Sequence, residues 1–341
     1  MRLYTSKDIS KLSKLAAPCG GVFAIIDNKV EDYFSAMRNC KIYSLSASES
    51  AKSLKTAEAI YSWLMENKAG RDCFIIGAGG GVTTDLAGFV ASTYKRGVRF
   101  GLVPTTLLSA ADASIGGKNG VNHLGIKNMI GTITQPEWVF QSPVFFRTLQ
   151  KRVFREGIAE ILKTFLIFSP DLFGFAVSFF SGYDHRHPSE KEEELLGRIV
   201  RECALLKMKV VKKDERDHGE RMVLNLGHTF GHALESWAAE NHKKILHGEA
   251  VAAGIIAAAK ASAALGLCTK NLATELAEDF KSVGLPGGFG IRISQIFSPI
   301  LQDKKVFSGD ISLILPKEIG NVVRYIIPVS ELKKICSRIT I

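Results

Sequence analysis

Cysteine is scarce and scattered in this chain. Its 341 residues include six cysteines, and no two of them form a C-x-x-C pair. The chain therefore carries no zinc-ribbon or redox-dithiol motif, and isolated thiols of this kind are typical of reduced proteins in a cytoplasm. We expect a cytoplasmic protein.

Long apolar runs that would anchor the chain in a membrane are also missing. The first thirty residues include three early lysines and no continuous apolar stretch, which is unlike a secretory signal peptide. The two most apolar stretches, 161–182 and 250–268, are interrupted by Lys163 and Lys260. Buried helices account for such stretches better than membrane spans, so we expect no membrane partner.

The positive charge of the chain lacks the pattern of a nucleic-acid surface. The formal net charge is +10, but the Lys and Arg residues are spread along the chain without interleaved aromatics. Positive charge also suits a site for polyanionic small molecules, and composition alone leaves both uses open. Hydrophobic residues make up 46% and charged residues 23%, which is typical of a globular protein.

The chain divides into two regions with different patterns. In the first half strands alternate with helices, which is typical of a parallel sheet covered by helices. Beyond about residue 150 the pattern is mainly helical. We therefore expect an α/β domain at 1–150 and a mainly helical domain at 151–341, with the boundary uncertain by a dozen residues. The predicted strands are 22–27, 73–76 and 99–104, and the predicted helices are 52–68, 85–94, 191–213, 226–240 and 249–265.

A glycine-rich turn follows the second predicted strand. The run Gly77–Gly81 leads into the helix that contains Asp85. Glycines let a backbone approach phosphate closely, and a helix N-terminus offers free N–H groups. The pattern departs from G-x-G-x-x-G because its third glycine is replaced by Val82, and the usual acidic residue some twenty positions later is absent. A dinucleotide site and a simple tight turn both remain open.

Histidines cluster in the second half. His228 and His232 are four residues apart and lie on one helix face, and His247 opens the next predicted helix. Upstream, Glu160 and Lys163 share a face. Three histidines and a carboxylate from separate helices suit a catalytic Zn²⁺ site, which needs three ligands and an open position. Hydrogen-bonded core histidines are the alternative.

A Gly-rich polar stretch runs from Asp112 to Asn128. It has too many glycines for a helix and too few apolar residues for a strand, so we expect a long loop. Lys118, Lys127 and Asn128 could hold phosphate or carboxylate there. A solvated basic loop is the alternative.

Together these motifs resemble the 3-dehydroquinate synthase family of sugar phosphate cyclases. The resemblance runs from about Ile25 to the segment Asp303-Lys304-Lys305, and its most specific motifs are N-L-G-H-T-F-G-H-A-L-E at 225–235 and A-S-I-G-G-K at 113–118. It implies a Rossmann-like NAD-binding α/β domain, a helical domain for metal and substrate, and an active site in the cleft between them. It also implies a homodimer without nucleic-acid partners.

The resemblance implies a role for each matching residue. The metal ligands, for zinc or cobalt, are Glu160, His228 and His247, which leaves His232 for proton transfer. Around the substrate are Asp112, Lys118, Asn128, Lys163, Lys207, Asp217, Arg221 and Asn225, with Arg96 reaching the phosphate site of the neighbouring subunit. The cofactor side comprises Asp27, Glu49, Lys52, Gly80, Gly81, Val82, Asp85, Thr105, Thr106, Lys118, Lys127 and Thr148.

Four positions depart from the family pattern. Asp217 replaces a longer Glu, Asn119 stands in the usual G-G-K-T-G, Gly125 is shifted by one position, and Glu156 replaces a smaller or neutral residue. None of these removes a ligand or a lysine, so they affect loop conformation and affinity rather than the chemistry.

The implied reaction is conversion of 3-deoxy-D-arabino-heptulosonate 7-phosphate into 3-dehydroquinate and phosphate. Transient oxidation by NAD⁺ would allow phosphate elimination, followed by re-reduction and an intramolecular aldol closure. Three alternatives stay open. They are another sugar phosphate cyclase, a metal-dependent alcohol or glycerol-phosphate dehydrogenase, and an inactive or nucleic-acid-binding descendant.

Overall fold

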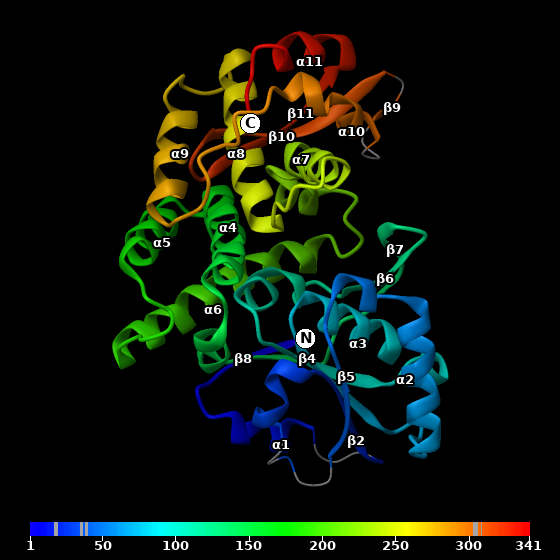
Figure 1. Ribbon diagram of the computed structural model, residues 1–341. Helices are drawn as coiled ribbons and strands as arrows, with labels where there is room; N and C mark the ends of the chain where they lie inside the picture. The colour runs from blue at the N-terminus through cyan, green and yellow to red at the C-terminus, as the bar shows by residue number, and fades with distance from the viewer. Residues whose placement is uncertain (17–19, 35–36, 38–39, 303–305, 308) are drawn as a thin grey trace. The chain divides into compact units, whose positions relative to one another are not determined.

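The chain forms two compact units. The computed structural model describes residues 1–16, 20–34, 37, 40–302, 306–307 and 309–341. One unit comprises 1–150 with 184–209, and the other comprises 151–183 with 210–341 (Figure 1). The sequence pattern predicts that all of 151–341 belongs to the second unit, whereas 184–209 belong to the first. Residues 184–209 join the first because Ala204 and Met208 of α6 (Glu190–Lys213) belong to its hydrophobic core. Cys19 and Asp303–Lys305 lie outside the described residues.

The first unit is built on a six-stranded parallel sheet, which confirms the expected fold class. Its order is β1-β8-β5-β4-β2-β3, and every neighbouring pair is parallel. The strands expected at 22–27 and 99–104 are confirmed, and the strand expected at 73–76 extends through the first glycines. In chain order the strands are β1 (Arg2–Thr5), β2 (Val22–Asp27), β3 (Cys40–Leu45), β4 (Phe74–Gly79), β5 (Arg99–Pro104) and β8 (Trp138–Gln141).

This sheet has its topological switch point between β2 and β4. The chain runs from β2 outward to β3, then returns to the other side of β2 as β4 and continues to β5. Ligands of open α/β sheets bind outside the carboxyl ends of the strands at such a point. Helix α2 (Leu54–Glu66) leads into β4, and α3 (Gly81–Thr93) follows it. The sequence thus directs its glycine-rich turn to the place where a ligand is expected.

The prediction of a long loop at 112–128 is wrong. A short π-helix (Ser109–Ala113) is followed by a β-hairpin of β6 (Lys118–His123) and β7 (Ile126–Ile133). The strands form because the hairpin packs on α3, where a Cβ on Gly88 would lie 1.9 Å from the side-chain oxygen of Asn119. The amide nitrogen of buried Asn119 donates to the carbonyls of Gly117 and Thr134. Backbone pairing and one covered face replace the apolar pattern that a strand usually shows.

The second unit is largely helical and includes a small sheet that the sequence pattern did not indicate. Strands β9 (Val306–Phe307), β10 (Asp310–Glu318) and β11 (Asn321–Pro328) form an antiparallel sheet in the order β11-β10-β9. The central helix is α8 (His247–Ala264), which contacts α4, α7, α9 and β10. The other helices are α4 (Lys151–Phe168), α5 (Pro170–Gly182), α7 (His228–Glu240), α9 (Leu272–Ser282), α10 (Phe297–Gln302) and α11 (Val329–Cys336).

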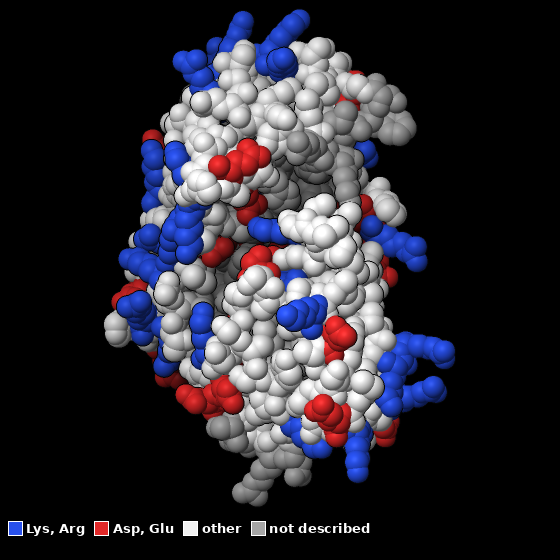
Figure 2. Space-filling view, turned by 45° about the vertical axis from the view of Figure 1, so that its right-hand side comes forward, with Lys and Arg blue, Asp and Glu red and all other residues white. Residues whose placement is uncertain are grey.

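The charged side chains and the hydropathy of the helices complete the description of the fold. On the face in Figure 2, Lys and Arg side chains are interspersed with Asp and Glu rather than gathered in one stripe. Among the described residues, no helix combines the length and apolar character needed to cross a bilayer.

Candidate metal centre and nucleotide site

Glycines bring α7 and α8 unusually close together. A Cβ on Gly254 of α8 would lie 2.1 Å from the carbonyl oxygen of Gly227, and one on Gly231 of α7 would lie 2.9 Å from that of Ala250. Neither position therefore tolerates a larger residue without backbone movement. Gly227 also adopts a left-handed φ of 80°, and α7 begins directly after it at His228. The close approach places His228 beside the start of α8.

Helix α4 joins the same site through another glycine of α8, Gly248. A Cβ on Gly248 would lie 2.4 Å from the Cα of Glu156 on α4. Glu160 lies one turn after Glu156 on the same face of α4. The approach of the two backbones therefore carries the Glu160 carboxylate to His247, the first residue of α8.

The start of α8 is held by a cap and an ion pair. The Glu249 carboxylate accepts a hydrogen bond from the backbone N–H of Leu246 at 2.9 Å. The same carboxylate binds the Arg152 guanidinium of α4 through two contacts, of 2.6 and 2.7 Å. A bidentate pair with a capping bond fixes the helix end in position as well as in direction. His247 is thus a ligand candidate on a rigid element.

Three donor atoms converge where these helices meet. Glu160 Oε1 lies 3.7 Å from His228 Nε2 and 3.4 Å from His247 Nε2. Ligand atoms about 2.0–2.1 Å from a tetrahedral Zn²⁺ are separated by about 3.3 Å. One carboxylate oxygen and two imidazole nitrogens at this spacing fit a divalent zinc or cobalt ion with an open position.

His247 presents its two ring nitrogens to two different carboxylates. Nε2 faces Glu160, whereas Nδ1 lies 3.6 Å from Glu235 Oε2. A metal-bound histidine commonly directs its other ring nitrogen to a carboxylate, which fixes the ring orientation. His232, Glu235 and His247 also form a second group with metal-ligand spacing. Glu160, His228 and His247 are the more deeply placed group, since the His232 side chain is exposed.

The electrostatics of the cluster favour an added positive charge. Burial alone raises the pKa of Glu160, but the Lys163 ammonium and the two imidazoles outweigh it and hold that pKa well below its ordinary value. Burial, reinforced by Lys163, lowers the pKa of His228 well below its usual range. Burial opposes protonation of His247 too, yet contacts with Glu160 and Glu235 raise its pKa to about 10. The proton on His247 thus supplies positive charge that a bound metal cation would otherwise supply.

Lys163 provides a buried cation next to the cluster. Its side chain is 2% exposed and forms an ion pair with Glu160, one turn earlier on α4. Glu160 is fully buried, and no described residue donates a conventional hydrogen bond to either of its oxygens. A buried carboxylate with this set of partners needs cations to stay charged, which a metal ion and Lys163 together would supply.

A loop before α7 holds other residues expected around the substrate. The Asp214 carboxylate accepts backbone N–H bonds from His218, Gly219 and Arg221, which closes the loop. Arg221 is buried, and its guanidinium donates to the carbonyl of Glu215 at 2.7 Å. The loop then reaches Asn225, three residues before His228.

The same loop explains one departure from the family pattern. Asp217 adopts a left-handed φ of 62°. Asp and Asn enter this region more readily than longer residues do. The local backbone therefore favours Asp at 217 over the expected Glu.

In the first unit, several expected cofactor residues form one polar cluster. The Lys52 ammonium contacts Asp85 of α3 and the side-chain oxygen of Asn128 of β7. Nearby, the Asn122 amide donates to Glu49 Oε1 at 2.8 Å. Burial raises the pKa of Asp85 to about 6 despite Lys52. Asn128, expected beside the substrate, thus lies with Lys52 and Asp85.

Glycines at the end of β4 and directly after it allow close packing beside this cluster. A Cβ on Gly77 would lie 2.5 Å from that of Ala87, so this glycine lets α3 pack closely on β4. Gly80 caps α3, and a Cβ there would lie 3.1 Å from the Thr106 methyl group. Asp27 ends β2, and Thr105 follows β5. Gly81, Val82 and Asp85 all belong to the first turns of α3, where backbone N–H groups favour phosphate.

A second ion pair in the first unit joins two expected substrate residues. The Lys207 ammonium donates to Asp112 Oδ1 at 2.7 Å and to the Asp112 carbonyl at 2.8 Å. Lys207 lies on α6 and is buried, so the pair ties α6 to the π-helix at 109–113.

The remaining expected residues are more dispersed. Arg96 follows the C-terminal end of α3, about 20 Å along the helix from Gly81. It is exposed, with a left-handed φ of 71°. Lys118 and Lys127 are exposed on the hairpin, and Thr148 ends a 3₁₀ helix at 143–148, where its hydroxyl donates to the Phe145 carbonyl.

Glu235 is the main group that reasoning from the sequence did not single out. It lies seven residues after His228 and three after His232, so its helical spacing places it on the same face. That periodicity could have identified it. Its pairing with His247, however, depends on how α7 and α8 pack.

Comparison with known proteins decides the family. A model described as 3-dehydroquinate synthase N-terminal matches residues 42–156, and one described as 3-dehydroquinate synthase C-terminal matches residues 157–306. The chain belongs to the 3-dehydroquinate synthase family. A 3-dehydroquinate synthase of Clostridium tetani is 39% identical over 298 residues, which cover 87% of this chain and 78% of that protein.

Solved structures confirm the fold of this 3-dehydroquinate synthase family member. A 2-epi-5-epi-valiolone synthase from Streptomyces hygroscopicus subsp. jinggangensis, with NAD⁺ and Zn²⁺ bound, matches with a TM-score of 0.84 and 24% identity, covering 98% of this chain and 94% of that one. A 2-deoxy-scyllo-inosose synthase complexed with carbaglucose-6-phosphate, NAD⁺ and Co²⁺ matches with a TM-score of 0.81 and 22% identity, covering 98% and 96%.

Proposed function

We propose that this protein is a 3-dehydroquinate synthase, a carbon–oxygen lyase of the shikimate pathway. It converts 3-deoxy-D-arabino-heptulosonate 7-phosphate into 3-dehydroquinate and phosphate. The convergence of Glu160, His228 and His247 carries the proposal, because a member of this family has kept a complete ligand set in a suitable geometry.

The proposed cofactors are NAD and a divalent zinc or cobalt ion. Support comes from the two related structures with these groups bound and from the two sites in this chain. NAD would bind at the switch point, against Gly80, Gly81 and the first turn of α3. When bound, NAD supplies a reversible hydride acceptor and the metal ion a Lewis acid that acidifies a hydroxyl group.

The residues of the chain bind and orient a substrate with two anionic groups. Buried Lys163, Lys207 and Arg221 supply fixed positive charge, which binds carboxylate and phosphate strongly because water is excluded. His232 is exposed and one turn from His228, so it can exchange a proton with the substrate and then with solvent. In this proposal His228 and His247 are metal ligands, and His232 transfers protons.

A carboxylate-bearing substrate distinguishes this proposal from other cyclases. Enzymes that act on a heptulose 7-phosphate or on glucose 6-phosphate need no group for a substrate carboxylate. This chain keeps Lys118, Asn128, Lys207, Arg221 and His232, the residues matched to that part of the site. A dehydrogenase of related fold would accumulate NADH, which the proposed cycle does not.

We further propose a cytoplasmic homodimer. Arg96 is exposed, has a left-handed φ and follows the end of α3 opposite Gly81, which suits a residue lent to a neighbouring subunit. The described cysteines are free thiols, as a reducing compartment allows. Sedimentation of the purified protein tests the dimer. A monomer that remains fully active contradicts the lent arginine.

The experiment that tests the function compares substrates. Metal-loaded protein with NAD⁺ is incubated with the heptulosonate phosphate, a heptulose 7-phosphate or glucose 6-phosphate, and released phosphate is measured. We expect release only from the first. Release from either sugar phosphate that lacks a carboxylate would instead assign the chain to another cyclase, and NADH accumulation would indicate a dehydrogenase.

A further inference from the structure

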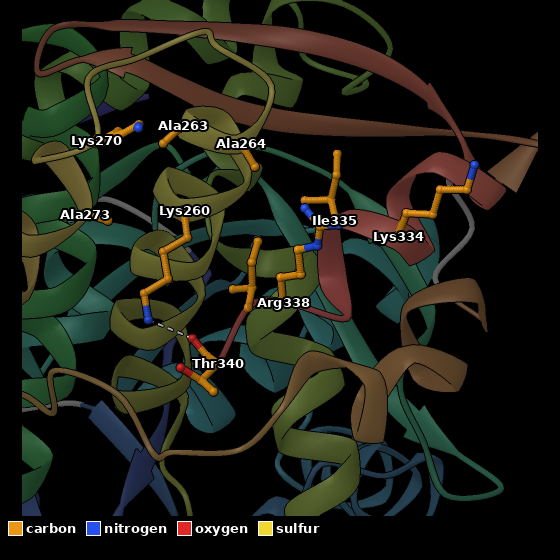
Figure 3. Close-up of a pocket in the computed structure, with 10 residues that line it drawn as sticks. Lys260, Ala263, Ala264, Lys270, Ala273, Lys334, Ile335, Arg338 and Thr340 are labelled. Atoms are coloured by element: carbon orange, nitrogen blue, oxygen red, sulfur yellow. Dashed lines mark hydrogen bonds between the residues drawn. The ribbon is translucent and has the colours of Figure 1, made fainter.

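A basic pocket lies in the second unit, away from the metal cluster. Its volume is about 540 Å³, and its walls come from the C-terminal end of α8, the start of α9, and α11 with the residues after it (Figure 3). Four cationic residues line it, together with alanine and isoleucine side chains. The cations are Lys260, Lys270, Lys334 and Arg338.

The charges in this pocket are unbalanced. None of its lining residues is acidic, and within the described part of the chain none of the four cations forms an ion pair. Lys270 and Lys334 stand on opposite sides of the pocket in Figure 3. Lys and Arg side chains also stand out at the top of Figure 2, the end where Figure 1 places α11. Like charges that line one pocket repel each other, and a bound anion relieves that repulsion.

Lys260 is the innermost of these cations. It ends a stretch of α8 that is buried from Gly248 to Ala259 except for partly exposed Glu249, and it is itself only partly exposed. Its ammonium donates to the Thr340 carbonyl at 2.8 Å, as the dashed line in Figure 3 shows. An ammonium has three N–H donors, so two are left for a ligand. Burial lowers the pKa of Lys260, which a bound anion would oppose.

The pocket is separate from the proposed catalytic site. Lys260 lies thirteen residues after His247 on the same helix, about 20 Å along its axis. An anion bound here therefore cannot take part in chemistry at Glu160, His228 and His247.

We propose that this pocket binds a small organic phosphate ester. Arg338 offers a planar fork of donors and the lysines offer point charges, which together suit a phosphate group. Ala273 lies in the first turn of α9, where the helix dipole also favours an anion. The apolar walls fit the organic part of the ligand, and the volume lies in the range of small-molecule sites, about 300–1,000 Å³.

The test uses methyl NMR on the full-length protein, because the proposed catalytic site also binds phosphate. Methyl groups of Ala263, Ala264 and Ile335 report on the pocket alone. Phenyl phosphate and inorganic phosphate are titrated separately to about 10 mM, which detects millimolar binding. Both should shift these signals saturably, and phenyl phosphate should bind more tightly because of the apolar walls.

Substitutions then identify the cations. Lys260→Gln and Arg338→Gln should each weaken binding about tenfold or more, as expected for a charge-assisted hydrogen bond. Lys334→Gln changes an exposed side chain, so it tests the site without threatening the fold. Lys333→Gln is the matched control, since Lys333 lies on the same helix outside the pocket.

Two results would overturn the proposal. The first is no shift of the pocket signals with either probe. The second is binding by Lys334→Gln and Arg338→Gln that is as strong as binding by the unmodified protein. A Lys333→Gln control that weakens binding as much as these two substitutions would have the same meaning. In either case the four cations do not form an anion-binding site.

Discussion

Alanine substitutions at His228 and His232 separate the two possible metal-ligand groups. The donor distances assign Glu160, His228 and His247 as ligands, whereas His232 belongs only to the alternative group with Glu235. A four-ligand zinc site is worth about 10–16 kcal/mol, or about 3 kcal/mol per ligand. His228→Ala should therefore weaken metal binding about 10²-fold or more, and His232→Ala by less than about threefold.

Replacing Glu235 should weaken metal binding by an amount between the effects of His232→Ala and His228→Ala. Its Oε2 lies 3.6 Å from His247 Nδ1, which corresponds to about 4–5 kcal/mol of direct attraction at an effective dielectric constant of about 20. The side chain is partly exposed, so solvent reduces this figure. Loss of such an orienting carboxylate typically costs about 10–100-fold in metal affinity. We expect that range for Glu235→Gln.

The assay combines chelator competition with the visible spectrum of the Co²⁺ form. Competition measures the affinity of each variant for Zn²⁺, and the cobalt spectrum reports coordination geometry. His232→Ala should keep the spectrum of the unmodified protein while turnover falls. If His232→Ala removes the metal and His228→Ala retains it, the ligand assignment is wrong and Glu235 is a direct ligand.

Three further predictions concern packing, pH and the first unit. Gly254→Ala should lower the free energy of unfolding by about 1–3 kcal/mol in urea denaturation, because the added Cβ would lie 2.1 Å from the Gly227 carbonyl oxygen. The control Gly174→Ala places its Cβ in open space on an exposed helix face, so it should be neutral or stabilising. Zn²⁺ affinity should rise about tenfold per pH unit between about pH 7 and 9, because His247, with its pKa raised to about 10, must release one proton; a pH-independent affinity contradicts this. In the metal-free protein the sign is opposite, since the stability contributed by protonated His247 is present below its ordinary pKa of 6.5 and is lost as pH rises through about 10. Lys207→Gln should lower kcat/KM about 10–100-fold with unchanged circular dichroism, because the ammonium holds both the carboxylate and the carbonyl of Asp112; unchanged kinetics would remove Lys207 from the site.

Much of the fold follows from local pattern. The strands at 22–27 and 99–104 and the helix near 247–264 are apolar runs with clear ends, and the helix near 190–213 has an amphipathic pattern. The hairpin of β6 and β7 could not be predicted in this way, because its strands depend on pairing with each other and on packing against α3. Similarly, α6 has a helical pattern that says nothing about the unit it joins.

The candidate site could likewise be predicted only in part from local sequence pattern. Spacing identifies His228 and His232 as neighbours on one face but treats them alike. Selecting Glu160 among 34 acidic residues required the family resemblance. The different roles of the two nitrogens of His247 follow only from the packing of α4, α7 and α8, which brings Glu160 to one nitrogen and Glu235 to the other.

The most direct test of the proposed function is a turnover measurement with limiting NAD⁺. The metal-loaded protein receives excess 3-deoxy-D-arabino-heptulosonate 7-phosphate and less NAD⁺ than substrate, and phosphate, 3-dehydroquinate and NADH are followed together. We expect equal amounts of phosphate and 3-dehydroquinate, far exceeding the NAD⁺ supplied, without net NADH. Product limited to the amount of NAD⁺, with matching NADH, would contradict a cycle in which the hydride is returned.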